Sequence, residues 1–174
     1  MKKISLVSGT YSLSSRVSGL IEFIQTEVGS AVDLETIHVH QLSATALITA
    51  NSTDPSIAAA NQSINESSGV IIVTPTFKAS FSGILKTYLD LLPQHALQNK
   101  IVLPLAVGGS TAHLLMLKYA LEPVLSELGA QHFIKDVYLL EAQIQKIGDH
   151  DFTIDGDAHA RLSCALKELL TTVQ

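Results

Sequence analysis

Three short segments carry residue types that can bind an anionic or flat ligand, and each follows an apolar run typical of a buried strand. The first is 9–16 (GTYSLSSR), the second is 74–83 (TPTFKASFSG) and the third is 108–113 (GGSTAH). Glycine, hydroxyl side chains and backbone N–H groups at the start of a helix are suited to binding anions. These three segments are therefore the first candidates for a ligand site.

The first segment favours a phosphate group. Its candidate ligand residues are Gly9, Thr10, Ser12, Ser15 and Arg16. Neither the GxxxxGK[ST] nor the GxGxxG pattern is present, so a mononucleotide phosphate is a better interpretation than a nucleoside triphosphate or a dinucleotide. The alternative is that Ser14 or Ser15 simply caps the helix that follows.

The second segment combines polar, aromatic and basic side chains. The strand Val70–Val73 is expected to stop at Thr74-Pro75, because proline cannot donate to a sheet ladder. Candidate ligand residues in the loop are Pro75, Thr76, Phe77 and Lys78. Ser82 is the expected N-cap of an amphipathic helix and a further candidate. The alternative is an ordinary connection between a strand and a helix.

The third segment follows the apolar strand 100–107, in which Pro104 is awkward for a central position. Gly108 and Gly109 allow the backbone to approach a flat ligand closely, and Ser110 and His113 add polar groups. The alternative is a turn with ordinary glycines.

The elements that must position these segments alternate regularly between strand and helix. We expect strands at 3–8, 31–39, 70–73, 100–107 and 131–140, and helices at about 16–28, 57–67, 83–92, 114–128 and 157–172. This alternation predicts an α/β fold with a five-stranded parallel sheet. Because the carboxyl ends of parallel strands share one edge, the three segments are expected to meet there. Segments 41–55 and 141–157 are interpreted as connections.

Several other features have simple structural interpretations. The helix 114–128 is apolar nearly all round, which favours a subunit interface over core packing alone, and Pro123 is expected to kink it. Cys164 is interpreted as a small packed residue. His38 and His40 can face one side of a strand, but no further ligand lies nearby in sequence. The segment 149–157 lacks the spacing of a calcium loop, so no metal site is predicted.

Composition narrows the class of protein. The chain has 174 residues, which suits one domain over 1–174, with 47% hydrophobic residues and a mean hydropathy of +0.32. Its net charge of −5 and scattered basic residues argue against binding to nucleic acid or to an anionic membrane. No apolar run is long enough to span a bilayer, and no signal-peptide pattern is present. A cytoplasmic protein is expected.

The stretch TPTFKASFSGILKTYLDLLP (74–93) resembles the flavin-ring loop of the NAD(P)H-dependent FMN reductases, which have a flavodoxin-like fold with three layers. The branch it resembles most supplies two-component alkanesulfonate monooxygenases. Pro75, Thr76, Phe77, Lys78 and Ser82 match the positions of that loop, with Phe77 standing where many members have Tyr.

The resemblance extends to other segments. Gly9, Thr10, Ser15 and Arg16 match a loop that wraps the FMN phosphate, whereas Ser12 stands where many members have Arg. The pair Gly108-Gly109 and the following His113 match a loop beside the flavin. Tyr119 matches an inserted residue that forms a π-bulge at a subunit contact near the flavin in that branch; a plain interface tyrosine is the competing interpretation.

The chemistry implied by the resemblance is the transfer of hydride from NADPH or NADH to FMN. The sequence contains no pattern of a catalytic triad, and a flavin carries its own redox chemistry, so no catalytic side chain is predicted. In the resembled branch, reduced FMN leaves and serves a partner monooxygenase in sulfur metabolism, and the enzyme is a homotetramer or dimer.

Two other functions remain open for this fold. In the first, FMN stays bound and electrons pass to quinones, azo dyes or metal oxyanions. In the second, the protein is a non-enzymatic electron carrier. The carrier is disfavoured because carriers dock through dense acidic surfaces, whereas the 16 acidic residues here are spread along the chain.

Overall fold

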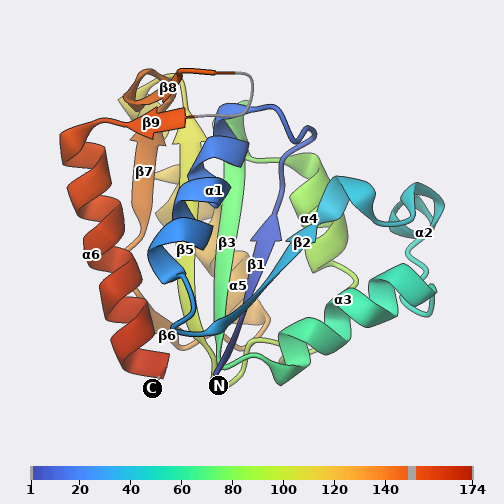
Figure 1. Ribbon diagram of the computed structural model, residues 1–174. Helices are drawn as coiled ribbons and strands as arrows, with labels where there is room; N and C mark the ends of the chain where they lie inside the picture. Colours follow the sequence, from blue (N-terminus) through green and yellow to red (C-terminus); the bar gives the residue numbers. More distant parts are fainter. Residues whose placement is uncertain (1, 149–151, 174) are drawn as a thin grey trace.

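The computed structural model describes residues 2–148 and 152–173. It is a parallel sheet covered by helices on both faces (Figure 1). The strands are β1 (Lys3–Ser8), β2 (Asp33–His38), β3 (Gly69–Phe77), β4 (Ser80–Phe81), β5 (Ile101–Gly108), β6 (His132–Phe133), β7 (Val137–Leu140), β8 (Ile144–Lys146) and β9 (Phe152–Ile154). The α-helices are α1 (Arg16–Val28), α2 (Ala44–Ile48), α3 (Pro55–Glu66), α4 (Gly83–Leu89), α5 (Glu122–Glu127) and α6 (Gly156–Val173).

The strand order is β2-β1-β3-β5-β6, and β7 continues the position of β6 along β5. All of these pairs are parallel, and the order is that of a flavodoxin-like sheet. The expected α/β, flavodoxin-like fold is therefore confirmed. In the described part of the chain the sheet has seven strands rather than the expected five.

Two local features account for the extra strands. The last expected strand is divided, since β6 pairs with Ile101 and Val102 while β7 pairs with β5 from Leu105 onward. Pro104 lies in the interval between these two ladders, where its missing N–H removes no pairing. The other addition is β4, which pairs antiparallel with the end of β3.

Two apolar layers form the core, one on each face of the sheet. One layer packs α1 and α6 against buried strand residues such as Ile4, Ile71 and Leu105. The other packs α2, α3, α4 and α5 against the opposite side chains of the same strands, including Val70 and Ile72. Figure 1 shows the same arrangement, with α1 and α6 in front of the sheet on the left. Burial on both faces explains why these strands are continuous apolar runs.

The strand β3 does not stop at Thr74-Pro75 as expected. It continues to Phe77, because β5 still pairs with β3 at Pro75 and β4 then pairs with Thr76 and Phe77. The neighbour on the other side, β1, pairs with β3 only as far as Val73. Pro75 therefore lies where β3 has a partner strand on one side only, which is compatible with a residue that cannot donate.

Two segments interpreted as connections contain regular structure. Segment 41–55 holds the short helix α2, capped by the side chain of Ser43. Segment 141–157 holds a 3₁₀ turn, η4 (Glu141–Gln143), and the antiparallel pair β8–β9. The discounted calcium-like segment 149–157 begins with three residues that lie outside the described part of the chain.

The segment 114–128 is not one continuous helix. A 3₁₀ turn, η2 (Thr111–His113), precedes it, and a π-helix, η3 (Leu117–Leu121), leads into α5. The N–H of Glu122 donates to the carbonyl of Leu117, five residues earlier. Pro123 follows in the first turn of α5, directly after the π-helix. The π-bulge anticipated around Tyr119 is thus present; Tyr119 lies inside it.

The position of Cys164 also differs from its prediction. Its side chain is exposed on α6 rather than packed in the core. It occupies the face of the helix opposite to Leu162 and Leu166, which are buried. Helical periodicity sends this position to solvent despite its apolar character.

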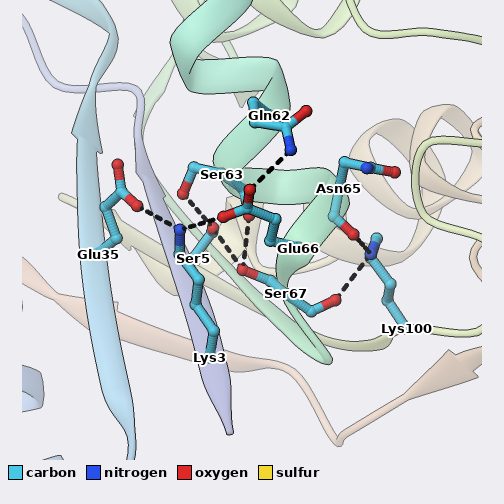
Figure 2. A network of polar contacts seen from close by, with 9 residues as sticks. All are labelled: Lys3, Ser5, Glu35, Gln62, Ser63, Asn65, Glu66, Ser67 and Lys100. Carbon is cyan, nitrogen blue, oxygen red and sulfur yellow. Dashed lines mark hydrogen bonds and ion pairs between the residues drawn. The ribbon is translucent and has the colours of Figure 1, made fainter.

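A polar network connects α3 to the amino-terminal ends of the strands, away from the candidate site (Figure 2). Lys3 Nζ lies 2.7 Å from Glu35 and 3.0 Å from Glu66. The contact with Lys3 lowers the pKa of Glu35, whereas the hydrogen bond from Gln62 and then the contact with Lys3 lower the pKa of Glu66. Lys100 Nζ donates to the carbonyl oxygens of Asn65 and Ser67 at the end of α3, and burial lowers its pKa. The network therefore holds α3 to β1 and β5.

Candidate functional site

The three candidate segments meet at the carboxyl edge of the sheet, as expected from the strand order. The N–H of Gly9 donates to the carbonyl of Val73 over 2.8 Å, which joins the first segment to the end of β3. Gly108 at the end of β5 is in register with Leu140 of β7. The first and second segments are also connected directly, because Ser82 Oγ donates to the Gly9 carbonyl over 2.6 Å.

The loop 9–16 is organised by its own hydroxyl groups. Thr10 Oγ1 lies 3.2 Å from the Ser12 carbonyl and 3.0 Å from Ser15 Oγ. Ser18 Oγ donates to the same Ser12 carbonyl over 3.1 Å. Ser15 is the N-cap of α1, and its hydroxyl accepts from the N–H of Ser18. The capping alternative for Ser15 is therefore correct as a structural role, and the loop still lies at the start of a helix.

The second segment is a β-hairpin with a two-residue turn. Thr76 pairs with Phe81 and Phe77 with Ser80, which leaves Lys78 and Ala79 at the tip. Both tip residues have positive φ, 50° for Lys78 and 61° for Ala79, as a type I′ turn requires. The turn fixes the direction in which Lys78 projects. The rings of Phe77 and Tyr11 lie 5.9 Å apart, and both are about half exposed.

The third segment approaches the hairpin closely. A Cβ atom on Gly108 would clash with the Tyr138 ring and hydroxyl and lie 3.0 Å from Thr76 Cβ, so this position requires glycine. Tyr138 in turn donates its hydroxyl hydrogen to the Ser110 carbonyl over 3.0 Å. A Cβ on Gly109 would meet no atom within 4 Å. Gly108 is therefore a packing residue, whereas Gly109 borders open space.

Two hollows flank the hairpin, and alternate hairpin residues face each of them. Pro75 and Phe77 line a cavity of about 440 Å³ together with the loop 9–16. Thr76 and Lys78 line a second cavity of about 400 Å³. Ala79, Gly109, Ser110 and His113 complete the lining of the second cavity. Thr76 Oγ1 is buried and has no hydrogen-bond partner within residues 2–148 and 152–173.

Three charged side chains line the first cavity: Arg16, Glu141 and Lys146. Arg16 Nη1 lies 3.7 Å from Glu141 Oε2, and both side chains are about half exposed. Lys146 of β8 also lines this cavity. Phe152 of β9 also lines this cavity, and its ring lies where a Cβ on Gly19 of α1 would fall.

The structure distributes the candidate residues unevenly. Thr10, Ser12, Ser15, Arg16, Pro75 and Phe77 line the first cavity, and Thr76, Lys78, Gly109, Ser110 and His113 line the second. Gly9, Gly108 and Ser82 lie behind these surfaces, and Ser82 is fully buried with its hydroxyl bonded on both sides. Tyr119 lies outside both linings and is 75% exposed on η3, which packs against β4.

Sequence reasoning missed several residues that line the first cavity. Tyr11 stands within the first segment, and its hydroxyl accepts from the N–H of Ile84 at the start of α4 over 3.2 Å. Glu141, Lys146 and Phe152 come from the segment interpreted as a plain connection. The alternation of Ile144 and Ile154 with polar neighbours was the available signal for the β8–β9 pair.

The donor groups fit a phosphorylated, planar ligand rather than a metal ion. The first cavity offers hydroxyl groups, a helix start and Arg16, which are the groups that bind a phosphate. The second offers an orphan buried hydroxyl and a glycine facing open space, which suit the edge and face of a flat ring. No group of three His, Cys, Asp or Glu side chains in the described residues is arranged to hold a metal.

The fold and the site define a class of protein: a flavodoxin-like α/β protein whose ligand site lies at the carboxyl edge of its sheet. Residues 2–145 match the family described as NADPH-dependent FMN reductase. The chain belongs to this NADPH-dependent FMN reductase family. It is an oxidoreductase that uses FMN and NADPH or NADH.

Similar proteins agree with this assignment. The chain is 38% identical over 144 residues to FMN reductase (NADPH) of Escherichia coli (strain K12), covering 82% of this chain and 75% of that protein. It is 39% identical over 165 residues to FMN reductase (NADPH) of Pseudomonas putida (strain KT2440), covering 94% and 80%. The apo crystal structure of an NADH:FMN oxidoreductase superposes with a TM-score of 0.89 at 32% identity, covering 100% of this chain and 91% of that chain.

Proposed function

We propose that this enzyme reduces FMN as a dissociable substrate and releases it to a partner monooxygenase. The observation that carries the proposal is the Arg16–Glu141 pair in the first cavity. Arg16 is the single basic residue of the loop 9–16, and a carboxylate of the same cavity competes for it. A phosphate that binds Arg16 would compete with Glu141 for its charge, which favours modest affinity and ready release.

The proposed roles of the site residues follow from their positions. The hydroxyl groups of the loop 9–16, the start of α1 and Arg16 would hold the phosphate of FMN. The hairpin residues Thr76 and Lys78, with Gly109 and His113, would hold the flavin ring and the approaching nicotinamide. FMN, when bound, supplies the redox chemistry by accepting a hydride from the nicotinamide. The protein orients both partners and needs no side chain that exchanges a proton.

The partner class is proposed from the resemblance to two-component systems. We propose that reduced FMN serves an FMN-dependent monooxygenase that uses O₂ to cleave the C–S bond of alkanesulfonates. We propose that this reaction takes place in the cytoplasm, because a reducing environment is compatible with the exposed free thiol of Cys164. No helix among the described residues has the length and apolar character needed to cross a bilayer.

A coupled assay tests the proposal. The purified reductase, NADPH and free FMN are combined with an FMNH₂-dependent alkanesulfonate monooxygenase and octanesulfonate, and sulfite is measured. We expect sulfite release that requires the reductase, FMN and NADPH together. A protein that purifies with FMN bound, reduces quinones or dyes without added FMN and yields no sulfite would contradict the proposal.

A further inference from the structure

A histidine lies behind the loop 9–16, outside both cavities. His40 belongs to the 3₁₀ turn η1 (Val39–Gln41), directly after β2. Its Nδ1 lies 3.1 Å from the carbonyl oxygen of Thr10. Because a carbonyl oxygen can only accept, Nδ1 carries the hydrogen in this contact. The contact joins positions 30 residues apart in sequence and ties the second strand's end to the first loop.

The direction of the Thr10 carbonyl determines the direction of the Tyr11 N–H, which belongs to the same peptide group. In a planar trans peptide the C=O and N–H groups point in opposite directions. Fixing the Thr10 carbonyl on His40 therefore turns the N–H of Tyr11 away from His40. Tyr11 and Thr10 both line the first cavity, and among the described residues the Tyr11 N–H meets no hydrogen-bond acceptor. An anion in this cavity would supply one.

The His40 ring is itself held in place. The ring of His38 packs edge-on against it, with 5.8 Å between centroids. Burial, and secondarily the neighbouring His40, lower the pKa of His38, which favours its uncharged form. Thr10 is almost fully buried and bonded through Oγ1 to Ser12 and Ser15. A rotation of the Thr10 peptide would disturb the whole hydroxyl array.

We propose that His40 is a positioning residue that orients the Thr10–Tyr11 peptide so that the Tyr11 N–H binds the phosphate of FMN. The inference rests on the proposed function, since it requires FMN as the phosphorylated ligand. His40 touches neither substrate. Its effect is exerted on the part of the ligand that distinguishes FMN from riboflavin.

The test compares FMN with riboflavin as the flavin substrate in NADPH oxidation. His40→Ala removes the donor, and we expect KM for FMN to rise about five- to tenfold, as for the loss of one hydrogen bond to a charged group, with kcat within about twofold. KM for riboflavin should stay within about twofold, because riboflavin has no phosphate. His40→Asn should restore KM for FMN, because its Nδ2 hydrogen occupies the place of Nδ1–H.

A control variant and a second measurement separate the proposed role of His40 from a general loss of stability. His132→Ala removes an exposed histidine from β6 at the opposite edge of the sheet and should change neither KM. In the unsubstituted protein, the amide resonance of Tyr11 should shift on titration with FMN and remain in place with riboflavin. This measurement holds even where His40→Ala fails to fold.

The inference is overturned if His40→Ala leaves KM for FMN unchanged, if KM for both flavins rises equally, or if His40→Asn is as impaired as His40→Ala. A Tyr11 amide that responds equally to both flavins also overturns it. If the unsubstituted protein oxidises no NADPH with FMN, the proposed function fails instead, and that result is separate from the behaviour of the variants.

Discussion

Arg16 shows how the balance of charge at one residue sets the behaviour of the site. Its ion pair with Glu141 joins two half-exposed side chains, and such pairs contribute at most about 1 kcal/mol. A phosphate dianion offers Arg16 a stronger partner, because charge-assisted contacts to phosphate are short and bidentate. The Arg16–Glu141 pair is thus weak enough for a phosphate to replace Glu141, and it still lowers the affinity of the site for that phosphate.

Ser12 offers a direct way to strengthen the site. Its carbonyl organises the loop, whereas its side chain contacts only the exposed Ser14. We predict that Ser12→Arg lowers the Kd for FMN about three- to tenfold by adding a second cation, and leaves the Kd for riboflavin unchanged. Fluorescence titration measures both constants. Ser12→Gln, which has no charge, is the control; equal tightening by Gln would show that charge is not the cause.

His38 gives a prediction about stability and pH. Its folded-state pKa lies below the ordinary value of 6.5, because burial disfavours the charged ring. Below about pH 6.5 the unfolded chain binds a proton at His38 that the folded protein does not bind. The free energy of unfolding therefore falls as the pH drops from the unfolded pKa to the folded pKa. Urea unfolding at about pH 7.5 and about pH 5.5 measures the loss.

His38→Asn should reduce this pH dependence, and His132→Asn, at an exposed position, should leave it as in the unsubstituted protein. A loss of stability of the same size in all three proteins would show that His38 is not its source.

At this scale the sequence predicted residue types well and contacts poorly. The hydroxyl groups and Arg16 of the first segment do line a cavity. The burial of Ser82 and the contact of His40 with Thr10 depend on positions 73 and 30 residues apart. No local pattern carries such information, because the sheet topology alone brings those positions together.

The hairpin β3–β4 is the element that divides the site. Its two-residue turn places Pro75 and Phe77 on one cavity and Thr76 and Lys78 on the other, as alternation along a strand requires. The sequence did not predict this hairpin, because neither Lys78 nor Ala79 is a typical residue for positive φ. Pairing with β4 outweighs the local preference.

The end of β5 gives a prediction with an adjacent control. Gly108→Ala places a methyl group against Tyr138 and Thr76, so we expect the free energy of unfolding to fall by about 1–3 kcal/mol. Displacement of Tyr138 would also remove its hydrogen bond to Ser110. Gly109→Ala meets no atom within 4 Å and should change stability by less than about 0.5 kcal/mol. Denaturant unfolding compares the two; equal losses would refute the packing role of Gly108.

At the scale of elements, proline was the least reliable signal. Pro75 was expected to end a strand and Pro104 to be awkward within one, yet both lie inside strands. In each case the neighbouring ladder is missing or interrupted on one side. The cost of proline therefore depends on which neighbour is present, and only the assembled sheet shows that.

On the scale of the whole molecule, one exposed apolar surface stands near the site. Leu114, Leu115 and Tyr119 precede or occupy η3 and are 43%, 57% and 75% exposed. η3 packs against β4, the second strand of the hairpin that lines the second cavity. This apolar surface therefore lies next to the hairpin. An apolar surface of this kind favours self-association, as proposed from the sequence.

We predict that the protein forms a dimer or tetramer and that Tyr119→Arg shifts it towards the monomer. Size-exclusion chromatography with light scattering gives the mass. Ile48→Arg, at an equally exposed apolar residue of α2, is the matched control and should leave the mass unchanged. A monomeric unsubstituted protein, or an oligomer that tolerates Tyr119→Arg, would contradict the prediction.

The global arrangement was the part best predicted from sequence. Apolar runs buried on both faces identify a parallel sheet, and the order of strands and helices leaves few alternatives for its topology. The β8–β9 pair escaped prediction because its strands are short and close over α1 through Phe152 and Gly19, a contact between segments far apart in sequence.

Whether FMN is a dissociable substrate is tested most directly by the oxidation of NADPH and NADH by the purified protein with and without added FMN, followed by nicotinamide absorbance. We predict that the protein purifies without retained flavin and turns over only when free FMN is added, with saturation at micromolar concentrations. A yellow protein that oxidises the nicotinamide with a quinone or dye in the absence of added FMN would contradict it.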